Sequence, residues 1–205
     1  MLQSGFVWIL LGFVVFGGLH SLLASLRAKA LAARWLGDAG RRGYRLFFNL
    51  SALISFAPIL ALVALLPDRR IYAIPLPWAL LTGALQLAAA LGMLVSVLQT
   101  HPLHFLGLEQ WTRPESAGDH PRELVVRGAY RYVRHPLYFF SLVILWLSPL
   151  MSWNVLAFNL GATAYMALGA WLLEEPKLIQ AFGEQYRAYR QSTPMLIPLI
   201  KLPKK

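Results

Sequence analysis

Charged side chains with the potential for chemistry occur at two places in this sequence. Arg134 and His135 stand directly before an apolar block, within the stretch GAYRYVRHPLYFF (Gly128–Phe140). Glu174 and Glu175 stand directly after a later apolar block. Cationic donors on one side and paired carboxylates on the other are the groups that hold a zwitterion, because its ammonium prefers carboxylates and its carboxylate prefers a cation. If the two places meet, they form one binding site.

Five uncharged apolar blocks must position these residues. Hydrophobic residues make up 58% of the 205 residues and charged residues only 14%, whereas a soluble domain is about half apolar and about a quarter charged. The excess falls in the blocks Phe6–Leu23, Leu46–Leu66, Leu76–Leu98, Leu137–Met151 and Trp153–Leu173. A membrane-spanning helix needs about 20 residues, and four of the blocks provide them. The composition therefore predicts an all-α, polytopic membrane bundle of five transmembrane helices.

The last two blocks are expected to form a helical hairpin with a tight turn near Met151. Leu137–Met151 is short for a span, since it reaches only about 22 Å, and the next block follows at once. His135 lies 16 residues before Met151 and Glu174 lies 23 residues after it. On antiparallel helices these positions are about 24 Å and about 35 Å from the turn, at the same end of the hairpin. The spacing allows either a ligand between the charges or a direct Arg–Glu ion pair.

The distribution of cations predicts the orientation in the membrane. Seventeen of the 19 lysines and arginines lie after the first, third and fifth blocks, and only Arg69 and Arg70 lie on the other side. The positive-inside rule then places the N-terminus outside and the C-terminus in the cytoplasm, as expected for a bacterial inner membrane protein. The first block has no cation before it and is expected to be a span, not a secretory signal. The net charge of +10 is expected to meet anionic membrane lipids, and no motif supports binding to nucleic acid.

We predict a single membrane domain, 1–205, in three parts. Residues 1–98 form three helices, 99–135 form a cytoplasmic connector, and 136–205 form the hairpin and a tail. Pro176 is expected to mark a bend or the start of a new helix. The apolar residues of the tail recur every three or four positions and predict an amphipathic helix on the cytoplasmic leaflet, with Arg187 and Arg190 on its other faces. These apolar residues are Leu178, Ile179, Phe182, Tyr186 and Tyr189.

Metal sites and cysteine chemistry are not predicted. The chain has no cysteine, which excludes disulfides, thiolate zinc sites and a cysteine nucleophile. His101 and His104 have a spacing that could suit a metal, but Pro102 lies between them and no third ligand is evident. His20 is expected to be a packing or interfacial histidine. We therefore predict no bound metal.

Several strings, in this order and spacing, resemble one known family. YRYVRHPLY, the hairpin, EE and FGEQYRAYRQSTPMLIP together resemble the integral membrane methyltransferases, which include isoprenylcysteine carboxyl methyltransferases, phospholipid methyltransferases and thiol S-methyltransferases. The resemblance covers Gly128–Pro198. Upstream, GLHSLLAS (Gly18–Ser25) and FLGLEQ (Phe105–Gln110) are most similar to the thiol S-methyltransferase branch.

The resemblance implies S-adenosylmethionine as the methyl donor, in a cytoplasmic pocket between the hairpin and the tail. The acceptor would be a small lipophilic or lipid-linked molecule: a thiol, a prenylcysteine carboxylate or a phospholipid amine. Arg134 and Glu175 are implied to be the indispensable, catalytic pair. Three residues depart from the family pattern: Ala129 in place of proline, Phe140 in place of glycine, and Pro176 directly after the glutamate pair. The residues implied to bind the donor are Tyr130, Arg134, His135, Pro136, Tyr138, Glu174, Glu175 and Tyr186.

Two other functions compete with an enzyme. A small transporter or channel would need charged residues inside its spans, and the five blocks contain none. A non-catalytic membrane scaffold would use the contact between Arg134 and Glu175 only to close the hairpin.

Overall fold

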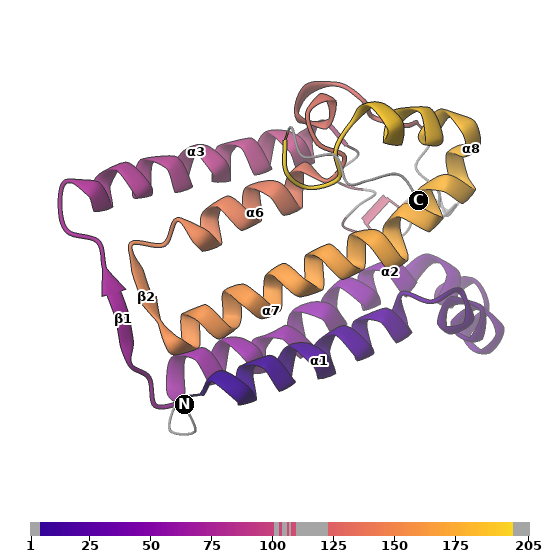
Figure 1. The fold of residues 1–205 in the computed structure, drawn as a ribbon. Coiled ribbons are helices and arrows are strands. Elements are labelled where there is room, and N and C mark those ends of the chain that lie inside the picture. Colours follow the sequence, from indigo (N-terminus) through magenta and orange to yellow (C-terminus); the bar gives the residue numbers. More distant parts are fainter. Residues whose placement is uncertain (1–4, 101–102, 104–105, 107, 110–122, 199–205) are drawn as a thin grey trace. The chain divides into compact units, whose positions relative to one another are not determined.

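The computed structural model describes residues 5–100, 103, 106, 108–109 and 123–198, and it is mostly helical, as predicted (Figure 1). It divides into two compact units. The first contains the described residues of 1–69, 101–119 and 153–161, and the second contains those of 70–100, 120–152 and 162–205. His101 and His104 lie outside the described residues. Among the residues that the structure does describe, no group of His, Cys, Asp or Glu could hold a metal ion.

The first unit packs its helices around Phe13. This residue lies in α1 (Phe6–Leu23), and its ring meets Phe56 of α2 (Leu26–Leu65) edge-on at 6.0 Å. It also meets Phe158, in the first part of α7 (Trp153–Gly169), at 5.4 Å, and the rings of Phe56 and Phe158 lie 5.9 Å apart. A Cβ at Gly161 would come within 2.3 Å of the Phe13 ring, so this glycine makes the close approach possible. Small residues at helix contacts are typical of membrane bundles.

Helix α2 begins 20 residues earlier than the predicted block Leu46–Leu66. Ser25 caps its first turn by accepting a hydrogen bond from the backbone N–H of Ala28 at 3.2 Å. The helix is interrupted at Gly37, whose φ of 57° and ψ of −131° suit only glycine. The cation-rich stretch after α1 is therefore an additional helical segment before the span, which hydropathy alone did not predict.

Polar groups join the end of α2 to the start of α7. The Asp68 carboxylate accepts the backbone N–H of Asn154 at 3.0 Å, which caps the first turn of α7. The buried side-chain amide of Asn154 in turn donates to the carbonyls of Val63 and Leu66, at 3.4 and 3.1 Å. These contacts satisfy backbone groups that a helix end leaves without partners.

The second unit pairs helices and strands that are far apart in the sequence. Helix α3 (Trp78–Leu98) lies beside α6 (Pro136–Trp146), as Figure 1 shows. Strand β1 (Arg70–Ala73) pairs with β2 (Leu150–Ser152) in an antiparallel sheet with Ala73 opposite Leu150. The tight turn predicted near Met151 was therefore wrong: this segment is extended, because its backbone groups bond to a second strand.

The five-span count is only partly reflected in the helices. Among the described residues, four helices are long and apolar enough to cross a membrane: α1, α2, α3 and the continuous helix Trp153–Ser192. The only helix in the predicted block Leu137–Met151 is α6, which has 11 residues and begins one residue before the block. It is shorter than a span, as its length suggested, and it ends before β2.

Phe140 packs against a glycine of α3. A Cβ at Gly92 would lie 2.5 Å from the ring atom Cζ of Phe140, so the ring occupies the space that this glycine leaves. Close by, the side-chain amide of Gln86 donates to the carbonyl of Ile144 at 2.7 Å. The departure of Phe140 from the family pattern is therefore matched by a small residue on the neighbouring helix.

The contact between Gly92 and Phe140 can be tested by mutation, with Gly83 of the same helix as the control. Gly92→Ala should lower the free energy of unfolding by about 1–2 kcal/mol, because the new methyl group forces Phe140 to move. Gly83→Ala, in the same helix, should be neutral or stabilising by about 0.5–1 kcal/mol, since nothing lies within 4 Å of its added Cβ. Denaturant titrations in detergent micelles measure both, and equal effects at the two glycines would refute the contact.

Candidate functional site

The arginine and histidine that precede α6 are fixed by the C-terminal segment. Helix α6 begins at Pro136, whose ring suits the first helical position. The backbone N–H of Arg134 donates to the carbonyl of Pro194 at 2.9 Å, and that of His135 donates to Met195 at 3.1 Å. The segment after α8 is thus bonded to the entrance of α6.

The two glutamates lie at the end of a wide helical turn. After α7, residues Ala170–Glu174 form a π-helix, η3, and α8 (Glu175–Ser192) continues from it with Pro176 in its first turn. A bend or a new helix was predicted near Pro176, but the backbone keeps helical angles through Glu174 and Glu175, so the helix continues there. The backbone departs from helical geometry later, at Gly183, with a φ of 54°. The predicted apolar face of the tail is therefore divided between two helical segments.

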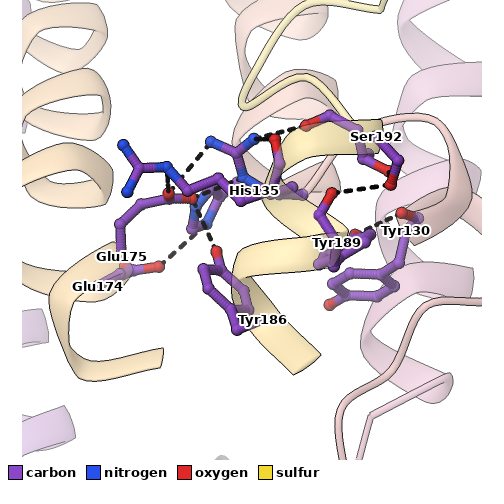
Figure 2. A network of polar contacts seen from close by, with 10 residues as sticks. Tyr130, His135, Glu174, Glu175, Tyr186, Tyr189 and Ser192 are labelled. Atoms are coloured by element: carbon purple, nitrogen blue, oxygen red, sulfur yellow. Dashed lines mark hydrogen bonds and ion pairs between the residues drawn. The ribbon is translucent and has the colours of Figure 1, made fainter. Parts of the chain in front are cut away.

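Glu175 is the centre of the site (Figure 2). Its side chain is only 4% exposed, and its Oε1 accepts hydrogen bonds from Arg134 Nε at 2.8 Å and from the Tyr186 hydroxyl at 2.7 Å. The His135 Nε2 lies 3.1 Å from the same oxygen. Its Oε2 accepts from the Arg134 Nη2 at 3.1 Å. The predicted convergence of Arg134 and Glu175 therefore occurs, as a direct ion pair.

His135 bridges the two glutamates. Its Nδ1 lies 3.2 Å from Glu174 Oε2, and its Nε2 faces Glu175. Burial disfavours a charged imidazole, but the hydrogen bonds to Glu174 and Glu175 outweigh it and raise the pKa of His135 above its usual value. A protonated ring suits this position, because both nitrogens then donate. The Tyr138 hydroxyl also donates to Glu174, at Oε1.

Two tyrosines of the tail have different roles. Tyr186 is buried and points its hydroxyl at Glu175, while Tyr189 donates to the backbone carbonyl of Tyr130 (Figure 2). Tyr130 belongs to the short 3-10 helix η2 (Gly128–Arg131). It takes part in this network through its carbonyl, whereas a side-chain contact with the donor was implied. That side-chain role stays a prediction.

The structure brings most of the predicted site residues into mutual contact. Arg134, His135, Tyr138, Glu174, Glu175 and Tyr186 form one connected network, and Pro136 sets the start of α6.

Sequence reasoning missed Arg190, which was assigned to another face of the tail helix. Its Nε lies 3.3 Å from Glu175 Oε2, and its backbone carbonyl accepts from Arg134. The spacing places Arg190 one helical turn after Tyr186, but it does not place either residue beside Glu175, because the backbone departs from helical geometry at Gly183. Arg187, in contrast, pairs with Glu184 on the surface.

The network has the chemistry needed to hold a zwitterion. Carboxylates, guanidinium groups and a tyrosine hydroxyl meet in one place, and Glu174 and Arg190 remain 43% and 48% exposed in their side chains. A bound molecule with an ammonium and a carboxylate would find a partner for each. The groups also close the helices on each other, so the geometry alone is compatible with a structural ion pair.

Comparisons with known proteins relate the part of the chain that carries most of this network to one family. The family model described as phospholipid methyltransferase matches residues 84–185. A methanethiol S-methyltransferase of Bradyrhizobium diazoefficiens is 29% identical over 92% of this chain and 65% of its own length. One from Crocosphaera subtropica is 37% identical over 54% of this chain and 45% of its own length.

Another relative is named for a different acceptor. A protein-S-isoprenylcysteine O-methyltransferase of Schizosaccharomyces pombe is 32% identical over 54% of this chain and 53% of its own length. The chain thus spans less than two thirds of each of these relatives. No solved structure matches the chain significantly. The predicted resemblance is nevertheless confirmed: residues 84–185 match the phospholipid methyltransferase family model, and methanethiol S-methyltransferases and an isoprenylcysteine O-methyltransferase are similar to this chain.

Proposed function

We propose that this protein is an S-adenosylmethionine-dependent methyltransferase of the membrane, and that its acceptor is a small thiol. One observation carries the proposal: Arg134, His135, Glu174 and Glu175 meet in a buried polar network inside the region that matches the family. The thiol is favoured over a prenylcysteine carboxylate or a phospholipid amine because a relative that aligns over 92% of this chain is named a methanethiol S-methyltransferase.

S-Adenosylmethionine, when bound, supplies a methyl group on a sulfonium. The thiolate sulfur forms the new C–S bond, the sulfonium S–C bond breaks with its electron pair left on the departing thioether, and the thiol proton passes to solvent. This displacement disperses charge, so alignment and exclusion of water supply much of the rate. The residues of the network would contribute by fixing the donor, and the cations Arg134, His135 and Arg190 favour the anionic form of a thiol nearby.

The proposal includes the arrangement in the membrane. We place five apolar segments in the bilayer, with α6 completing the set although it is short, and α8 on the cytoplasmic surface as an amphipathic element. The excess of cations after the first, third and fifth segments supports a cytoplasmic C-terminus and an external N-terminus. A bacterial inner membrane suits this arrangement. The donor then enters from the cytoplasm, and the acceptor enters through the lipid or from the membrane surface.

The test is direct binding followed by turnover. Purified wild-type protein in detergent micelles should bind S-adenosylhomocysteine in isothermal titration calorimetry. It should then transfer a labelled methyl group from S-adenosylmethionine to methanethiol or another small thiol, in preference to a prenylcysteine or phosphatidylethanolamine. If the protein methylates a prenylcysteine or phosphatidylethanolamine faster than the thiols, the proposed acceptor is wrong and the proposed methyl transfer stands.

A non-catalytic scaffold is the competing function, and one observation favours it. Arg134 and Glu175 are bonded directly to each other, as expected if they only close the helices. The same titration decides between the two, because a scaffold needs no affinity for the nucleoside. If the folded wild-type protein does not bind S-adenosylhomocysteine, the proposed enzymatic function is wrong and the scaffold function is supported.

A further inference from the structure

The polar network consists of an inner and an outer part, which differ in how fully their hydrogen-bonding capacity is used. The inner part is Arg134 and Glu175, with side chains that are 8% and 4% exposed. The outer part is Glu174 and Arg190, with side chains that are 43% and 48% exposed. The difference matters for ligand binding, because a group already bonded on all sides has nothing to offer a ligand.

Glu175 has no capacity left. A carboxylate has about four lone-pair sites, and contacts from Arg134, His135, Tyr186 and Arg190 reach the two oxygens of Glu175 at 2.7–3.3 Å.

Arg134 is similarly occupied. Its Nε and Nη2 donate to Glu175, and its Nη1 donates to the carbonyls of Arg190 and Thr193. Arg134 and Glu175 therefore make the contacts of a structural ion pair. A ligand could bond to either residue only by displacing these contacts.

Glu174 and Arg190 have capacity to spare. Each oxygen of Glu174 has one contact among the described residues, with Tyr138 at Oε1 and His135 at Oε2. Arg190 uses only its Nε toward Glu175, so within the described part of the chain the four N–H groups on its two terminal nitrogens have no protein acceptor. One anion and one cation, both half-exposed, thus border the same buried carboxylate–imidazole contact.

Resting on the proposed function, we propose that Glu174 binds the ammonium and Arg190 the carboxylate of the donor's amino-acid end. Arg134 and Glu175 are positioning residues that hold these two in place. Arg190 would present two adjacent N–H groups to the carboxylate, the geometry that a guanidinium offers best. This assignment reverses the expectation from the family resemblance, in which Arg134 and Glu175 were the indispensable ligand-binding pair.

Truncated ligands test the assignment atom by atom. The ligands are S-adenosylhomocysteine, its decarboxylated analogue, which keeps the amine, and its deaminated analogue, which keeps the carboxylate. Arg190→Gln should weaken binding of S-adenosylhomocysteine and of the deaminated analogue by about tenfold to a hundredfold, and leave the decarboxylated analogue within about threefold. Glu174→Gln should show the opposite pattern. Arg190→Lys should bind S-adenosylhomocysteine more tightly than Arg190→Gln but less tightly than the wild type. It keeps the positive charge and loses the two adjacent N–H donors of the guanidinium group.

The pair Arg187 and Glu184 provides matched controls on the same helix. These side chains contact each other at 3.5 Å on the surface and are 59% and 87% exposed. Arg187→Gln and Glu184→Gln should bind all three ligands like the wild type. Equal losses for all ligands in Arg190→Gln, or no loss at all, would overturn the assignment while the proposed function stands. A wild-type protein without affinity for S-adenosylhomocysteine would overturn both.

Discussion

Glu175→Ala is expected to lower the free energy of unfolding by about 3–5 kcal/mol, because it leaves buried cations without their counter-charge. Arg134, with a side chain only 8% exposed, would lose the acceptor for two of its nitrogens, and His135 would lose one of its two carboxylates. The Tyr186 hydroxyl, also buried, would lose its partner. Binding of S-adenosylhomocysteine should disappear together with this support.

Denaturant titrations in detergent micelles measure the loss in stability, and calorimetry measures the loss in binding. Glu184→Ala is the matched control, since this glutamate lies on the same helix with an 87% exposed side chain. Its effect should stay within about 0.5 kcal/mol, as is usual for surface ion pairs. A Glu175→Ala protein as stable as this control would show that Glu175 is not the buried centre of the network.

Arg134→Lys is expected to lower the free energy of unfolding by about 2–4 kcal/mol even though it keeps the positive charge. Arg134 bonds both oxygens of Glu175 with a planar fork and also reaches the carbonyls of Arg190 and Thr193. A lysine ammonium offers three donors from a single point and cannot span these acceptors. Acceptors left without a donor inside the protein account for the expected loss.

The matched control for this change is Arg131→Lys, at an exposed residue three positions earlier. It should alter stability by less than about 0.5 kcal/mol. Thermal unfolding of the two variants in the same detergent gives the comparison. If Arg134→Lys unfolds at the same temperature as the wild type, then a positive charge alone suffices at this position. The planar geometry of the guanidinium group then has no role.

The main apolar helices could be predicted from hydropathy. The block Phe6–Leu23 coincides with α1, and Leu76–Leu98 begins two residues before α3. Long uncharged runs have one stable arrangement in lipid, so their boundaries follow from composition. That Arg134 and Glu175 lie at the same end of the hairpin also followed from the sequence, because the two residues are separated from the connection near Met151 by helices that run in opposite directions.

The remaining features depend on contacts that leave no local pattern. The pairing of β1 with β2 joins segments of four and three residues from distant parts of the chain. The break at Gly37 looked like any glycine among cations. Arg190 reaches Glu175 only because the tail changes direction at Gly183, and a regular helix projected from the sequence puts this arginine elsewhere. Spacing also could not decide between an ion pair and a bound ligand.

The π-helix Ala170–Glu174 makes the length of this segment as important as its residues. An ordinary α-helix turns about 100° per residue. If one of the apolar residues were deleted here, the wide turn would tighten into the regular form, and the side chains downstream would face His135 at a different angle. A single-residue deletion should thus weaken the contacts of Glu175, although every charged group would still be present. A related chain that lacks one residue at this point should present the side chains of its C-terminal helix at a different angle.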